Sequence, residues 1–257
     1  MTISKEEIQE LIQLLDDPNA MVNQTVTQNL MDQGTNIIPD LEAAWEGSLD
    51  SDYQEKLMNL IQDIQFKSTD DMLREWLSTG ASDLLKGAYI IARYQYPDLQ
   101  LEDLEKPLDK IFKDVWLELN NNLTALEKIR ILNHILFEVN GFSRNTKNFY
   151  SPQNSFINQV LETRKGNPIS LAVLYSVVAQ RLGLPVYGVN LPRNFILAYE
   201  DEMVSGDNFD EVTENILFYI NPYNRGTVLG RKEIEYFLKQ QNIEPQPSYF
   251  TSCSNPD

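Results

Sequence analysis

The sequence holds one cysteine and one histidine, so a thiol-based catalytic site would have to combine these two residues. Such a site needs a thiolate, an imidazole that takes and returns its proton, and a third group that orients the imidazole. Cys253 lies in a C-terminal segment rich in proline and serine, and His134 lies in the apolar part of an expected helix. Nothing around either residue activates a thiol or aims a base. We therefore expect a thiol on a mobile tail and a packed or surface histidine.

The sequence gives little support for a metal-binding site or a phosphate-binding site. One histidine and one cysteine cannot close a zinc site, and no run of carboxylates matches a calcium-binding loop. No glycine-rich phosphate loop is present either. We expect no metal and no cofactor.

Composition places the chain in an ordinary class. With 257 residues, 42% hydrophobic and 23% charged, it is typical of a soluble globular protein, and one cysteine suits a reducing compartment. Residues 1–17 form an acidic amphipathic pattern rather than a signal peptide. The longest apolar run, 169–179, is too short to cross a bilayer. These features predict a cytoplasmic protein.

Charge is unevenly distributed along the chain. A net charge of −17 disfavours binding to nucleic acid or to an anionic membrane surface. Residues 1–50 carry ten acidic groups against one lysine, whereas residues 144–199 carry six basic groups against one glutamate. Two explanations of this basic island remain open: it binds an acidic ligand, or it docks the acidic helices of the same chain.

The first part of the sequence predicts helices throughout, and the run LIQLLDDPNAMVNQTVTQNLMDQGTNIIPDLEAAW resembles a HEAT repeat. Ser68 to Asp71 are expected to begin a new helix. A packing layer and a partner-binding surface are both compatible with this region. Apolar spacing predicts helices at about 8–15, 22–34, 37–45, 51–65, 69–79, 81–95, 101–119 and 124–139.

The pattern changes after Gly141. A helix is expected from about residue 154, with Asn154 or Ser155 as its cap, and Pro168 opens a second helix that is apolar on most faces. Strands are expected at 186–190, 195–199 and 216–220, with a loop at 201–215 and a last helix at 231–240. We therefore predict a helical region at 1–120, a second domain at 121–242 and an extended tail at 243–257.

Two segments, NSFINQVLETRKGNPISLAVLYSVVAQRLGLPVYGVNLPRNFILAY and FYINPYNRG, resemble the transglutaminase-like superfamily. The resemblance covers residues 154–226, about a third of the chain, and is nearest to a bacterial branch named after a regulator of invasion genes. Members of that branch often add helical or tetratricopeptide repeats. The resemblance implies a mostly helical α+β fold in which a buried helix packs against a small antiparallel sheet. Relatives commonly continue into further helices, so a truncation after Asp257 is left open.

The resemblance also locates three chemical positions. Active members place the nucleophilic cysteine at the N-terminus of the buried helix, and here Pro168 falls on that position. The histidine position corresponds to Asn194 and the aspartate position to Asn221. Proline has no nucleophile, and asparagine does not titrate near neutral pH. The nearest hydroxyl, on Ser170, would point about 200° around the helix from the required direction. We expect a protein that is not an enzyme.

A cleft that lacks the three catalytic residues would still contain polar side chains. Asn154, Arg164, Gly166, Asn194 and Asn221 are expected to form a hydrogen-bonded network below the helix N-terminus. That network either holds the core together or, with Ser170 and Arg193, lines a site for an acidic peptide or small anion.

The function predicted from the sequence is a protein-interaction or scaffold module whose partner the sequence does not identify. The alternative is a cryptic hydrolase or amidase that uses Ser170 or Cys253 with His134.

Overall fold

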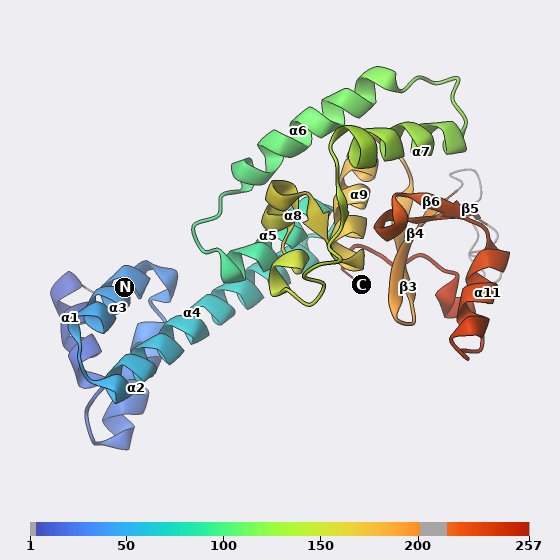
Figure 1. The fold of residues 1–257 in the computed structure, drawn as a ribbon. Coiled ribbons are helices and arrows are strands. Elements are labelled where there is room, and N and C mark those ends of the chain that lie inside the picture. Colours follow the sequence, from blue (N-terminus) through green and yellow to red (C-terminus); the bar gives the residue numbers. More distant parts are fainter. Residues whose placement is uncertain (1–3, 201–214, 257) are drawn as a thin grey trace. The chain divides into compact units, whose positions relative to one another are not determined.

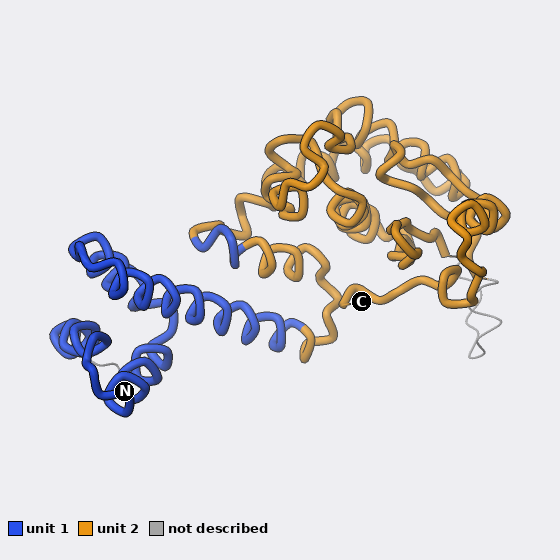
Figure 2. Tube along the Cα trace, turned by 60° about the horizontal axis from the view of Figure 1, so that its bottom comes forward, with its two compact units in different colours: residues 1–76, 93–97 blue, residues 77–92, 98–257 orange. Residues whose placement is uncertain are grey.

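The computed structural model of the chain describes residues 4–200 and 215–256. The chain forms two compact units, residues 1–76 with 93–97 and residues 77–92 with 98–257, which Figure 2 colours separately. The domain limits expected at 120 and 242 stay predictions. The loop expected at 201–215 lies outside the described residues, apart from Asn215.

The first unit is helical. It contains α1 (Lys5–Leu14), α2 (Ala20–Met31), α3 (Ile38–Gly47) and most of α4 (Ser51–Ser78). Ser4 and Asn19 cap α1 and α2, because their side-chain oxygens accept hydrogen bonds from the first free backbone N–H groups. The apolar face of each helix meets the others in one core, made of Ile12, Leu15, Val26, Leu30, Ile37, Leu41, Leu57, Leu60 and Ile64.

The prediction of two helices at 51–65 and 69–79 is wrong, because α4 runs through both ranges without a break. No glycine or proline interrupts this sequence, and the polar run at 68–71 is accommodated on the helix surface. The Thr69 hydroxyl donates to the Gln65 carbonyl 2.9 Å away, and Asp70 forms an ion pair with Arg74 one turn later. The side chains of serine, threonine and aspartate can find hydrogen-bond or ionic partners inside a helix as well as at its start. Residues 68–71 therefore do not mark a helix start here.

The second unit surrounds one central helix, α9 (Pro168–Arg181) (Figure 1). Nine residues of α9 are buried, and most of them are apolar. Its neighbours in the core include residues of α6, α7, α8 and the sheet. The other helices of this unit are α5 (Leu84–Gln95, as far as Ala92), α6 (Leu101–Glu118), α7 (Ala125–Asn133), a π-helical segment (His134–Val139), α8 (Ile157–Thr163) and α11 (Arg231–Gln240).

The sheet of the second unit has four antiparallel strands in the order β3, β4, β5, β6. Their bounds are Val186–Leu191, Asn194–Glu200, Ile216–Asn221 and Thr227–Leu229. A separate parallel pair joins β1 (Ser143–Arg144) to β2 (Lys165–Gly166). The first three strands of the sheet were expected from the sequence, whereas β1, β2 and β6 are too short to leave a periodic signal.

Both faces of this sheet are covered. Leu197 and Ile220 belong to the large core around α9, while Ile196, Ala198 and Tyr219 face a second cluster with α11 and the C-terminal segment. Neighbouring residues of β4 thus point to opposite faces, as the alternation of a strand requires. Strands that are buried on both sides are apolar throughout, and FILAY within β4 shows this directly.

The C-terminal segment is held against the sheet rather than mobile, so the expectation of a mobile tail thiol is wrong. The Cys253 amide donates to the Gly188 carbonyl at 2.7 Å, which adds a bridge at the edge of β3. Phe250 is only 1% exposed. A Cβ atom at residue 188 would lie 2.6 Å from Phe195 Cζ and 2.7 Å from Cys253 Sγ, so glycine is required for this close approach.

These observations confirm a mostly helical α+β fold with a buried helix on a small antiparallel sheet. No helix in the described ranges combines the length and apolarity needed to cross a bilayer.

The buried Tyr219 predicts a loss of stability at high pH. Burial raises the pKa of Tyr219 from 10.0 to about 12, and its phenol donates to the Phe250 carbonyl at 2.9 Å. Because the unfolded chain loses this proton first, the free energy of unfolding should fall as pH rises from about 10 to 12. Denaturant unfolding at several pH values should give a shallower fall for Tyr219→Phe than for the wild type. Equal slopes for the two proteins would contradict the assignment.

Candidate functional site

The N-terminus of α9 is closed by reciprocal hydrogen bonds between Asn167 and Ser170. The Ser170 amide donates to Asn167 Oδ1 at 2.8 Å, and the Asn167 amide donates to Ser170 Oγ at 3.0 Å. Pro168 occupies the first helical position, where its missing N–H leaves no hydrogen bond unmade. The capping pair therefore satisfies the Ser170 amide, one of the free donors of the first turn, within the chain.

The Ser170 hydroxyl has a fixed role in this arrangement. The side chain is 3% exposed, and its Oγ lies 2.6 Å from the Asn154 carbonyl oxygen, to which it donates. A hydroxyl can donate one hydrogen bond, and here a main-chain carbonyl oxygen accepts it. The His134 imidazole, the base considered in the alternative prediction, lies instead 2.9 Å from Glu138 on its own helical turn and is about half exposed.

Asn154 is the centre of the polar network below α9. It is 5% exposed, and its Oδ1 accepts from Asn145 Nδ2 at 2.8 Å. Its Nδ2 donates to the carbonyls of Asn148 and Phe149 at 2.7 and 3.0 Å. Every polar atom of this buried amide thus has a partner, which fixes the loop 145–150 to the start of α9.

The expectation that Asn154 or Ser155 caps a helix is wrong. Both residues lie in a 3-10 turn, Pro152–Ser155, and α8 begins only at Ile157 without a side-chain cap. The Asn154 side chain turns toward the preceding loop instead, where its Nδ2 donates to the carbonyls of Asn148 and Phe149.

Gly166 permits the close contact between β2 and α9. A Cβ atom at this residue would lie 2.6 Å from Ser170 Oγ and 3.0 Å from Leu171 Cγ. The Gly166 carbonyl also accepts from the Asn145 amide at 3.1 Å. Of the residues predicted from the sequence, Asn154, Gly166 and Ser170 are therefore brought together around one point.

The other two asparagines lie at one end of the sheet. The antiparallel register sets the start of β4 beside the end of β5, and the turn Pro222–Asn224 after Asn221 packs against α9. Asn194 Oδ1 accepts from the Phe195 amide at 2.9 Å, and Asn221 Oδ1 accepts from the Asn224 amide at 3.2 Å. Within the described residues, no hydrogen bond joins either side chain to the other or to the network around Asn154.

The two predicted arginines have local structural partners. Arg164 has a left-handed conformation with φ 59°, and its guanidinium lies 4.7 Å from the centre of the Phe142 ring. Its carbonyl accepts from the Ser143 amide at 2.9 Å in the β1–β2 pair. Arg193 lies in the tight turn between β3 and β4 and donates to Gln241 at 3.3 Å.

A surface that the sequence analysis missed lies beside the network. Phe149 and Tyr150 are 45% and 92% exposed, and their rings meet edge to face with centroids 5.0 Å apart. Arg144 and Lys165 lie in the paired strands β1 and β2, and Lys147 lies in the same loop as the two rings; all three are exposed, and none forms an ion pair with another described residue. We call these five residues the aromatic–basic surface. The basic island at 144–199 gave its three cations as a sequence signal, but not the two exposed rings beside them in the chain.

Side chains that hold metals do not gather in the described parts of the chain. No group of three or more His, Cys, Asp or Glu residues lies close enough to share a metal ion there. The described residues of this site offer hydrogen bonding, positive charge and exposed aromatic area.

Comparison of the sequence with known proteins found a matching family model and several similar proteins. A family model described as the transglutaminase-like superfamily matches residues 102–257. A UPF0162 protein of Xylella fastidiosa (strain Temecula1) is 34% identical over 151 residues, which is 59% of this chain and 50% of the relative. A UPF0162 protein of Vibrio cholerae is 27% identical over 179 residues, 68% of this chain and 62% of the relative.

A eukaryotic protein shows similarity as well. Human F-box only protein 21 is 29% identical over 180 residues, covering 61% of this chain and 28% of that protein. The chain spans about half the length of the Xylella relatives it matches. No solved structure matches the chain.

The contact between Gly166 and Ser170 predicts a destabilising substitution. Gly166→Ala should lower the free energy of unfolding by about 1–3 kcal/mol, because the new methyl group overlaps Ser170 Oγ and Leu171. Chemical denaturation measures the change. Gly47→Ala is the matched control, since a Cβ at residue 47 meets nothing within 4 Å.

A double-mutant cycle separates this contact from general damage. If Ser170 Oγ causes the clash, Gly166→Ala should cost less in a Ser170→Ala background than in the wild type. Additive costs, or no difference from Gly47→Ala, would contradict the described packing.

Proposed function

The chain belongs to the transglutaminase-like superfamily, and we propose that it is a catalytically inactive member that acts as a protein-interaction or scaffold module. The observation that carries this proposal is the aromatic–basic surface, whose loop is hydrogen-bonded to the network at the start of α9. The proposed ligand is an acidic peptide with an apolar anchor.

Two features support the absence of catalysis. Pro168 has no side-chain nucleophile, and the nearby Ser170 hydroxyl donates its hydrogen bond to a main-chain carbonyl. A nucleophilic hydroxyl needs a base that accepts this proton, and Ser170 has no hydrogen bond to His134 among the described residues. The asparagines at 194 and 221 bond their local backbone and carry no charge.

The charge and shape of the aromatic–basic surface support an acidic partner. Three cations without ion pairs favour carboxylate groups, and exposed aromatic rings supply contact area at low entropic cost. The net charge of −17 opposes an acidic partner at long range. At physiological salt, however, that repulsion is screened beyond about 8 Å, so the local cations decide the contact.

The position of the loop also favours binding. Asn154 bonds two carbonyls of the loop 145–150, and Asn145 bonds both Asn154 and Gly166. A loop ordered before binding loses little conformational freedom when a partner arrives.

The wider setting that we propose is the bacterial branch named after a regulator of invasion genes, with a cytoplasmic location. In this proposal the first helices form a HEAT-like layer, whose stacked helices offer a further contact surface.

Charge reversal on the aromatic–basic surface tests the proposed binding. A fluorescent peptide of alternating glutamate and leucine should bind the wild type, as measured by fluorescence anisotropy. The double variant Lys147→Glu with Lys165→Glu should bind at least about tenfold more weakly, which corresponds to about 1.4 kcal/mol. Tyr150→Ala should also weaken binding, because it removes the most exposed ring.

The control keeps the same change in net charge. Lys113→Glu with Lys239→Glu alters two exposed lysines on α6 and α11, away from the surface, and should leave binding nearly unchanged. Equal weakening by both double variants would mean that overall charge, rather than this surface, governs binding. That result would overturn the proposal.

A further inference from the structure

The turn between α3 and α4 in the first unit exposes two large apolar side chains (Figure 1). Trp45, in the last turn of α3, is 41% exposed. Leu49 follows the helix and is 102% exposed, so its side chain is bare of contacts that would shield it from water. Apolar side chains that gather at one exposed place are typical of interaction surfaces, and tryptophan is enriched in them.

Hydrogen bonds hold this turn in one shape. The Gln54 side chain of α4 donates to the carbonyls of Trp45 and Ser48 at 3.1 and 2.8 Å. Asp50 caps α4, because its Oδ1 accepts from the Tyr53 amide at 3.1 Å. The two apolar side chains are therefore presented by an ordered segment, which loses little conformational freedom when a partner binds.

Carboxylates accompany the two apolar residues. Three exposed glutamates of α3 and α4 form no ion pair with another described residue: Glu42, Glu46 and Glu55. No lysine or arginine occurs between residues 6 and 55. Glu42 and Glu46 are four residues apart on α3, so two like charges are neighbours there, and a cation from a partner would relieve their repulsion. We call these three glutamates, with Trp45 and Leu49, the acidic–apolar turn.

The acidic–apolar turn has the chemistry of the ligand proposed for the aromatic–basic surface. That surface presents three cations without ion pairs and the exposed rings of Phe149 and Tyr150. The turn presents three carboxylates and the side chains of Trp45 and Leu49. Opposite charges and apolar area thus match across the two surfaces, as they do in specific protein interfaces. Every copy of the chain carries both a binding surface and a matching ligand.

We propose that copies of the chain associate head to tail, with the acidic–apolar turn of one copy docked on the aromatic–basic surface of the next. This inference rests on the proposed function, because it names the acidic partner of that same surface. The two copies use different patches, so association continues from copy to copy unless a ring closes. The net charge of −17 on each copy opposes the approach, and salt screens this repulsion beyond about 8 Å. We expect a weak contact.

Sedimentation velocity at physiological salt tests this association. The wild type should change from single chains of 29.6 kDa to larger species as its concentration rises from about 1 µM to about 1 mM. Lys147→Glu with Lys165→Glu should weaken association at least about tenfold. Glu46→Lys with Glu55→Lys should have an effect of the same size. Leu49→Ala should also weaken association and leave the fold intact, because this side chain is fully exposed.

A mixture of the two double variants tests whether the two surfaces meet each other. One variant keeps the acidic–apolar turn and the other keeps the aromatic–basic surface, so the mixture should form a complex although each variant alone stays a single chain. The control is Glu118→Lys with Glu244→Lys, which makes the same change in net charge at two exposed residues outside both surfaces. Self-association of the control should stay within about twofold of the wild type.

Three results would overturn this inference. The first is a wild type that stays a single chain up to about 1 mM, and the second is a mixture of the double variants that forms no complex. The third is equal weakening by the control, since overall charge would then govern association. A sedimentation coefficient that changes in the variants but not with concentration would indicate docking within one chain, which also contradicts it. If the glutamate–leucine peptide still binds the aromatic–basic surface in these cases, the proposed function stands.

Discussion

The burial of α9 is the constraint on which the rest of the second unit depends. Helices cover the faces of α9 that the sheet does not, and most of its side chains are apolar and buried. A helix in this position cannot leave its end groups to bulk water, so the chain must supply the partners itself. At the first turn the partners are Asn167, Ser170 and the Asn154 carbonyl. Gly166 is small because β2 must approach this turn closely.

The packing around α9 also divides the basic side chains of residues 144–199 into those with structural partners and those that remain available to a ligand. The basic island contains six cations, yet three of them have structural partners: Arg164 lies over Phe142, Arg181 pairs with Asp109, and Arg193 donates to Gln241. Only Arg144, Lys147 and Lys165 of that island lie on the surface without such a partner among the described residues. An intramolecular role and a binding role for the island are thus compatible, since different residues serve each.

Much of the second unit could be predicted because its elements carry strong local signals. Pro168 marks a helix start, and the apolar runs of α9 and of strands β3 to β5 identify those elements. The network around Asn154 could be predicted only in part. Asn154, Gly166 and Ser170 do meet, but Asn194 and Asn221 bond their own backbone. Residue type alone does not reveal which backbone group an asparagine will find.

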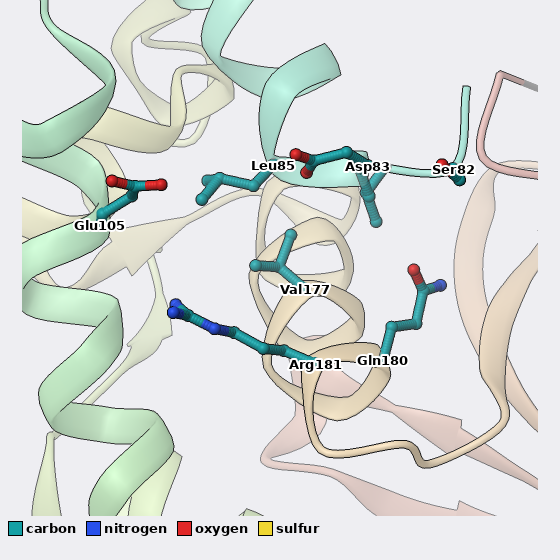
Figure 3. Close-up of a pocket in the computed structure, with 8 residues that line it drawn as sticks. Ser82, Asp83, Leu85, Glu105, Val177, Gln180 and Arg181 are labelled. Carbon is teal, nitrogen blue, oxygen red and sulfur yellow. The ribbon is translucent and has the colours of Figure 1, made fainter. Parts of the chain in front are cut away.

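The other features that the sequence did not predict depend on contacts between residues far apart in the chain. Nothing near Cys253 indicates that Gly188, far away in the sequence, leaves space for it on the edge of β3. A cavity of about 370 Å³ at the C-terminal end of α9 likewise joins residues from three distant segments (Figure 3). Single-sequence patterns report the preferences of neighbouring residues, whereas such contacts arise only when the chain has folded.

The central claim is that the start of α9 is a structural junction and not a reactive centre. Mass spectrometry of the intact protein after exposure to a fluorophosphonate at neutral pH tests it most directly. If the buried Ser170 hydroxyl donates its hydrogen bond to the Asn154 carbonyl rather than to a base, Ser170 should stay unlabelled in the folded wild-type protein. Stoichiometric labelling at Ser170, lost in Ser170→Ala and in His134→Ala, would contradict this account.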